Sequence, residues 1–147
     1  MPLRHILIQL LTAYIGSFGF GLLFGLRARH LYFAALGGMI AWGIYLGISA
    51  LIPGLFFANL CASVFAVTYA ELMAHLRKCP ATLFVVPGVV PLVPGSSLYY
   101  AMDCAVNGDL VGAGAYGHQT LVAALAIAAG ISFVTVCREL RTPRTRE

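Results

Sequence analysis

Five apolar runs of about 21 residues divide almost the whole chain, and their length limits the possible folds more than any other feature. They cover roughly residues 6–26, 31–51, 55–75, 81–102 and 117–137. An α-helix rises about 1.5 Å per residue, so each run can cross a hydrocarbon core of roughly 30 Å. The sequence therefore predicts an all-α integral membrane protein, a single domain of about five transmembrane helices.

Composition supports this class of protein. Hydrophobic residues make up 61% of the chain and charged residues 10%, with a mean hydropathy of +0.91, whereas a soluble domain has roughly 45–50% and 25%. The first run is about twice as long as the apolar core of many signal peptides and lacks a following A-x-A site, so we expect it to stay in the membrane.

The basic residues predict the orientation. Eight of the nine Lys and Arg residues follow the first, third or fifth run, and Arg4 precedes the first. These eight are Arg27, Arg29, Arg77, Lys78, Arg138, Arg141, Arg144 and Arg146. Because positive residues concentrate in the cytoplasm, we expect the N-terminus outside and the C-terminus inside. Residues 138–147 would then form a short basic cytoplasmic tail. We expect a multi-pass protein of the bacterial inner (plasma) membrane. A four-span topology, with 31–51 interfacial or re-entrant, stays open.

Three prolines lie inside the fourth run, at Pro87, Pro91 and Pro94. Each removes an amide donor and clashes with the carbonyl four residues earlier, so the carbonyls of Leu83, Pro87 and Val90 lose their helical partners. Three such losses within two turns argue against a continuous helix. The sequence therefore predicts a broken fourth span.

Backbone left unpaired at membrane depth is tolerated where it is buried in protein or lines a watery cavity, so the break predicts a cavity. If helix resumes after Pro94-Gly95, Ser96 or Ser97 is the expected N-cap, and the free amides of that half-helix suit a substrate carboxylate. A structural kink without a ligand is the alternative. The residues predicted to bind substrate or line its pathway are Pro87, Gly88, Pro91, Pro94, Gly95, Ser96, Ser97, Tyr99 and Tyr100.

Ionisable residues near the membrane are candidates for proton coupling, because an unpaired charge in the bilayer is costly. Glu71 and His75 lie four residues apart and can pair on one helix face. They form either an interfacial pair or a proton relay. Asp103, at the outer end of the fourth run, is either a vestibule charge or a solvated residue.

Small residues recur every four positions in three of the runs, which lets another helix approach closely. They are Ala13, Ser17, Gly21 and Gly25, then Gly43 and Gly47, and then Ala124, Ala128 and Ser132. The pattern is typical of packing within the chain and also of a subunit interface.

Several function classes lack support. The four cysteines form no CxxC pair and no metal-ligand spacing, and no hydrolase triad, P-loop or zinc motif is present. We therefore expect no metal, no cofactor and no enzymatic activity. The net charge of +4 reports the basic ends of spans rather than a nucleic-acid surface.

The second half of the chain resembles the small membrane subunit of the threonine/serine exporter family, the YjjB-like or ThrE C-terminal half. The resemblance rests on the segments 71–76, 79–81, 86–96, 99–102, 107–109 and 119–121, with Ala126, Ile127 and Gly130. Its most specific part is the Pro-Gly-x-x-Pro-x-x-Pro-Gly-Ser sequence that begins at Pro87.

The resemblance implies a secondary, proton-coupled exporter of small amino acids such as threonine and serine, or of dicarboxylates such as succinate. It also implies a larger membrane subunit as partner, and an odd span count suits such a half-transporter. Homo-oligomerisation would meet the same need. The rival hypothesis is a non-transporting scaffold subunit of a membrane complex.

Overall fold

The computed structural model describes residues 3–141, and all regular elements within that range are helical. The elements are α1 (Leu3–Leu23), α2 (Ala28–Leu51), α3 (Leu55–Arg77), α4 (Thr82–Val89), the 3₁₀ helix η1 (Val90–Leu92), α5 (Gly95–Val106) and α6 (Leu110–Arg141). Within the described residues, four helices are long and apolar enough to cross a membrane. The number rises to five if the bent pair of segments, residues 82–92 and 95–106, counts as one further span. The predicted all-α membrane fold is confirmed, whereas its orientation stays a prediction.

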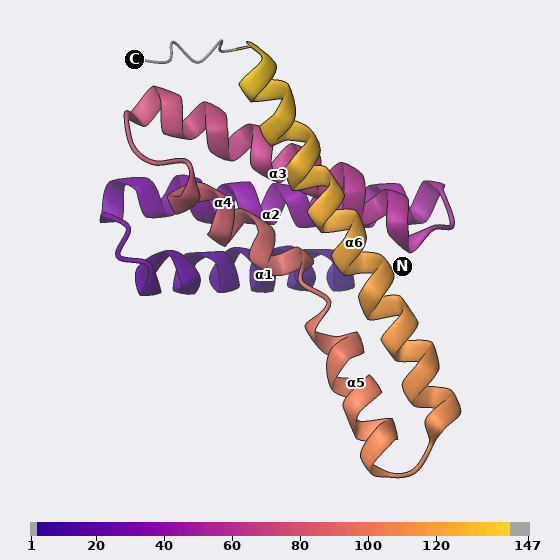
Figure 1. Ribbon diagram of the computed structural model, residues 1–147. Helices are drawn as coiled ribbons and strands as arrows, with labels where there is room; N and C mark the ends of the chain where they lie inside the picture. Colours follow the sequence, from indigo (N-terminus) through magenta and orange to yellow (C-terminus); the bar gives the residue numbers. More distant parts are fainter. Residues whose placement is uncertain (1–2, 142–147) are drawn as a thin grey trace.

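Helices α1 to α4 form a bundle in which α1, α2 and α3 run side by side and α4 lies against all three (Figure 1). Small residues bring these helices close together. Ala13, Ser17 and Gly21 are the buried residues of α1, so this part of the predicted ladder does pack within the chain. Gly25 lies beyond the helix in a turn with φ of 69°.

The crossing of α1, α2 and α4 is the tightest of these contacts. A Cβ atom added to Gly38 would collide with Ser17 and would lie 3.0 Å from the carbonyl oxygen of Pro87. The predicted ladder of Gly43 and Gly47 does not form this crossing, because Gly47 is exposed with open space around it.

The fourth span is broken as predicted. Its axis bends by 51° between residues 82–92 and 95–106. The amide of Val93 donates to the carbonyl of Val90 at 3.2 Å, so a tighter turn replaces the bond that Pro94 cannot make. The expected cap was wrong: α5 begins at Gly95 with Pro94 as N-cap, because the Pro94 carbonyl accepts the first helical hydrogen bond, from the Leu98 amide at 3.1 Å. Ser96 and Ser97 lie within the first turn.

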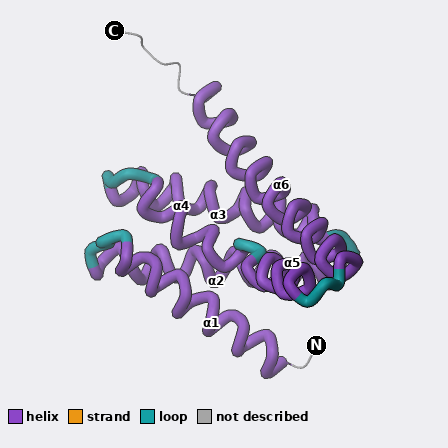
Figure 2. Tube along the Cα trace, turned by 60° about the horizontal axis from the view of Figure 1, so that its bottom comes forward, coloured by secondary structure: helices purple, strands orange, loops and turns teal. Residues whose placement is uncertain are grey.

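Helix α5 and the first part of α6, residues 95–120, form an arm that extends away from the bundle (Figure 1). In Figure 2 this arm comes towards the viewer. None of the residues of α5 is buried, and the rings of Tyr100 and Tyr116 lie 5.5 Å apart within the arm. Helix α6 begins seven residues before the predicted start at 117. Asp109 accepts the Gly112 amide at 3.0 Å and so caps the helix early.

Helix α6 then crosses α3 and ends at Arg141, so its last turn extends into the predicted tail. Gly130 allows the close crossing, since a Cβ there would lie 3.1 Å from the carbonyl oxygen of Leu60. The predicted ladder at 124, 128 and 132 lies on the exposed face instead, and a different set packs inward. The buried residues of α6 are Ala123, Ala126, Ile127, Gly130 and Val134. Residues 142–147 lie outside the described part of the chain.

Candidate functional site

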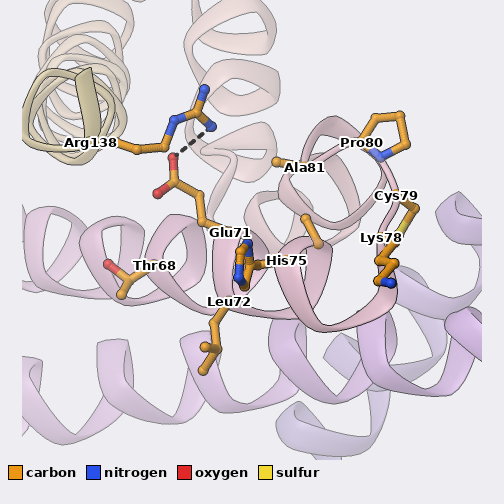
Figure 3. Close-up of a pocket in the computed structure, with 10 residues that line it drawn as sticks. Thr68, Glu71, Leu72, His75, Lys78, Cys79, Pro80, Ala81 and Arg138 are labelled. Carbon is orange, nitrogen blue, oxygen red and sulfur yellow. Dashed lines mark hydrogen bonds and ion pairs between the residues drawn. The ribbon is translucent and has the colours of Figure 1, made fainter. Parts of the chain in front are cut away.

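A pocket of about 1130 Å³ lies where the end of α3, the α3–α4 loop and the end of α6 meet (Figure 3). Its walls are mixed, with five ionisable side chains and several apolar ones. Its lining residues are Thr68, Glu71, Leu72, Ala74, His75, Lys78, Cys79, Pro80, Ala81 and Arg138. This pocket therefore combines the size of a small-molecule site with charges of both signs.

An ion pair crosses the wall of this pocket. A guanidinium nitrogen of Arg138 donates to the Glu71 carboxylate at 3.4 Å (Figure 3), and the two side chains are 56% and 21% exposed. Thr68, Glu71 and Arg138 also line a neighbouring pocket of about 360 Å³, so the pair stands on the border of both pockets. A pair this exposed contributes about 0–1 kcal/mol to folding, so a ligand can replace either partner at little cost.

His75 lies one turn along α3 from Glu71 and shares the pocket (Figure 3). Within residues 3–141, an ion pair of Glu71 is formed with Arg138, and a role of Glu71 and His75 in proton coupling stays a prediction. Lys78 ends α3 in a left-handed conformation with φ of 52°, and the next amide, of Cys79, closes the turn on Ala74 at 3.1 Å. This cap places Lys78 in the pocket wall.

The predicted pathway residues lie elsewhere. Pro87 and Gly88 are buried in the bundle, and Pro91 lines a small pocket of about 190 Å³ with residues of α1 and α2. At the start of α5, Pro94 and Ser97 are partly buried, and the rest of the predicted set is exposed. These exposed residues are Gly95, Ser96, Tyr99 and Tyr100.

Asp103 does not join the other two coupling candidates. It is exposed on α5, within the arm, where the side-chain amide of Asn107 donates to its carboxylate at 3.3 Å. The structure thus brings Glu71 and His75 together and leaves Asp103 with a local partner.

Sequence reasoning missed Arg138 as a site residue and placed it in the basic tail. It is 67 positions from Glu71, so the contact depends on how α6 crosses α3. The available signal was its place as the first charge after the last apolar run, next to Cys137.

The pocket offers side chains that can recognise charged groups. Among residues 3–141, no three His, Cys, Asp or Glu side chains are arranged to hold a metal ion. Arg138 and Lys78 provide positive charge for a carboxylate, and Glu71 provides negative charge for an ammonium group. Both ends of a small zwitterion therefore find a partner of opposite charge here.

Comparison with known proteins identifies the class of transporter. A family model described as "Threonine/Serine exporter, ThrE" matches residues 9–137, which include all the pocket residues except Arg138. No curated protein and no solved structure matches the chain. The family match covers most of the 147 residues and all the apolar helices at least in part. This chain belongs to the threonine/serine exporter family.

Proposed function

We propose that this chain is the membrane subunit of a secondary, proton-coupled exporter of threonine, serine or related small amino acids, completed by a larger membrane subunit. Dicarboxylates such as succinate are the second candidate substrates. The observation that carries the proposal is the Glu71–Arg138 pair on the wall of a pocket of about 1130 Å³.

The charges of the pocket favour an amino acid over a dicarboxylate. The guanidinium of Arg138 suits the carboxylate of the solute, and the carboxylate of Glu71 suits its ammonium group. A dicarboxylate would pair with Arg138 and Lys78 but would meet the negative charge of Glu71. A zwitterionic amino acid bound in this way places neither of its charges against a like charge of the Glu71–Arg138 pair.

Proton coupling follows if a proton and the ammonium group of the solute compete for Glu71. Protonation of Glu71 removes the negative partner of the ammonium group and so weakens solute binding. Loss of that proton restores the ion pair with Arg138 and resets the pocket. His75 lies beside Glu71 and is suited to pass the proton to or from water. The exchange drives solute out as protons enter.

A partner subunit accounts for the exposed arm. Helix α5 has no buried residue, and Ala124, Ala128 and Ser132 present small residues on the outer face of α6. A second helix can approach closely along such a face. A second copy of this chain would use the same surface, and co-purification distinguishes the two partners.

The test replaces Arg138 and measures efflux of labelled threonine and succinate from cells that assemble the native complex. We expect Arg138→Gln to lower threonine efflux about tenfold or more, because a hydrogen bond to a charged group contributes roughly 1.5–3 kcal/mol. Arg29→Gln is the matched control, since Arg29 is exposed at the start of α2 and outside the pocket. Full threonine efflux by Arg138→Gln, at wild-type membrane levels, would contradict the proposal, and a loss of succinate efflux alone would identify a dicarboxylate exporter.

The broken span offers a separate test of transport against the scaffold hypothesis. Replacing Pro91 and Pro94 with alanine restores two amide donors, which favours a straighter span. We expect such variants to insert normally and to export poorly. Unimpaired export by stable variants would favour the scaffold hypothesis for this break.

A further inference from the structure

A pocket of about 360 Å³, the α3–α6 pocket, adjoins the Glu71–Arg138 pair. Apart from the pair, its lining residues precede the pair along both helices: Val64 and Thr68 on α3, and Phe133, Val134 and Cys137 on α6. The larger pocket, of about 1130 Å³, instead extends past Glu71 to the α3–α4 loop. The ion pair therefore stands between two pockets that lie in different directions along α3.

The walls of the two pockets differ in chemistry. Beyond the residues that both pockets share, the larger pocket contains His75 and Lys78, whereas the α3–α6 pocket has no further acidic or basic side chain among the described residues. The Thr68 hydroxyl donates to the Val64 carbonyl at 2.7 Å, so its proton is used within α3. The α3–α6 pocket therefore favours an apolar group, and the larger pocket favours a charged or polar one.

The ion pair limits where the side chain of a bound amino acid can point. The ammonium and carboxylate groups of an amino acid are attached to one carbon, and the Glu71 and Arg138 atoms that would bind them lie 3.4 Å apart. That carbon then lies at the border of the two pockets, because Glu71 and Arg138 line both (Figure 3). The side chain can therefore enter the α3–α6 pocket while both charged ends keep their partners.

The size of the α3–α6 pocket suits side chains longer than that of threonine. Whole drug-sized ligands occupy roughly 300–1,000 Å³, so about 360 Å³ is more than the side chain of serine or threonine fills. Val134 is buried and Phe133 is 62% exposed, so the pocket has one wall inside the protein and one at its surface. Methyl groups of a solute that enter between these walls leave water, which favours binding.

We propose that the α3–α6 pocket binds the side chain of the solute, and that this exporter therefore carries the aliphatic amino acids valine, isoleucine and leucine as well as threonine. The inference rests on the proposed function, in which Glu71 and Arg138 bind the charged ends of the solute. Val64, Phe133 and Val134 then determine specificity, because they contact the part of the solute that differs between amino acids. An acyl chain of a lipid is the alternative occupant.

Competition measures this selection. Inside-out vesicles from cells that assemble the native complex take up labelled threonine, and unlabelled alanine, valine or leucine competes. We expect valine and leucine to compete at about tenfold lower concentration than alanine, because one methylene group in an apolar pocket already changes binding by about tenfold or more.

Two substitutions change the α3–α6 pocket and leave the ion pair in place. Val64→Phe fills the pocket, and Phe133→Ala removes its outer wall. Both should bring the ratio between leucine and alanine towards one. Val136→Phe should preserve the ratio and is the matched control, because Val136 is exposed on α6 and lines neither pocket. Phe133→Ala, at an exposed position, decides the test if Val64→Phe does not fold.

Cys137 lines the α3–α6 pocket and reports on its occupancy without transport. Its thiol is free and exposed, as is that of Cys61, which lines neither pocket. We expect leucine to slow maleimide labelling of Cys137 in the native complex in nanodiscs, in a saturable way and at about tenfold lower concentration than alanine. Labelling of Cys61, followed by mass spectrometry in the same sample, should stay unchanged.

The outcomes separate this inference from the proposed function. Equal competition by leucine and alanine overturns the side-chain pocket while leaving threonine export intact, and it leaves the pocket to lipid acyl chains. A ratio that both pocket variants, or the one that folds, leave unchanged does the same. Absence of threonine uptake contradicts the proposed function, and the labelling of Cys137 then decides the pocket. Labelling of Cys137 that leucine does not slow overturns the inference.

Discussion

The α1–α4 bundle and the α5–α6 arm are built from similar apolar sequences but pack in opposite ways. In the bundle, Gly38 allows Ser17 and the Pro87 carbonyl to meet at a crossing where no side chain fits. In the arm, α5 contains no buried residue. The lipid does not drive helices together, so close packing of small residues decides which helices associate.

This difference teaches that hydropathy alone does not specify tertiary contacts in a membrane. In the bundle, small residues such as Ser17 and Gly38 face one another within one chain. Beyond the arm, the small residues Ala124, Ala128 and Ser132 lie on the exposed face of α6, so a helix of another chain can pack there in the proposed assembly. The break at residues 93–94 separates the two regions.

The largest expected effect comes from filling the crossing in the bundle. Gly38→Ala should lower the free energy of unfolding by about 1–3 kcal/mol, because the added methyl group overlaps Ser17 and approaches the Pro87 carbonyl. Gly47→Ala on the same helix, with open space around it, should be neutral or slightly stabilising. Unfolding in detergent micelles measures both, and equal stabilities of the two variants would show that the crossing is not tight.

A smaller effect is expected at the cap of the arm. Asp109→Ala should cost about 1 kcal/mol, because the Gly112 amide loses its acceptor. Hydrogen exchange should quicken in residues 95–120 and stay unchanged in the bundle, because the two regions pack separately. Asp103→Ala is the control, because the Asp103 carboxylate accepts a hydrogen bond from the Asn107 side chain, whereas Asp109 caps the start of α6. Faster exchange throughout α1–α4 would show that the arm and the bundle unfold together.

The smallest effect on the chain itself is expected from the exposed ladder. Ala128→Leu should change the free energy of unfolding by less than about 0.5 kcal/mol, because Ala128 is exposed. It should nevertheless prevent co-purification of the partner subunit. Ala129→Leu, also exposed but off the ladder, should retain the partner. Retention of the partner by both variants would remove the ladder from the interface.

The sequence predicted the features that depend on local chemistry. The length of the apolar runs predicted the helices. The prolines Pro87, Pro91 and Pro94 predicted the break, because a missing amide donor leaves a carbonyl without its helical hydrogen bond within one turn. The sequence did not predict Pro94 as the N-cap of α5, since that depends on the Pro94 carbonyl accepting the Leu98 amide.

Contacts between distant segments were the part that sequence could not supply. Glu71 and His75 were expected to form an interfacial pair or a proton relay on one helix face, and sequence offered no sign that Arg138, from a different helix, would pair with Glu71. The repeat at 124, 128 and 132 was compatible with packing within the chain and with a subunit interface, because a repeat of small residues does not say which neighbour it meets. Both contacts depend on how α6 crosses α3.

The most direct test of the account is the coupling of protons to solute at Glu71. In vesicles with a controlled pH gradient, Glu71→Gln should bind threonine weakly and move it at a rate independent of the gradient, because the carboxylate for which proton and ammonium compete is gone. Glu139→Gln, which changes an exposed acid outside the pocket, should keep the wild-type dependence. A wild-type response to the gradient in Glu71→Gln would contradict the account.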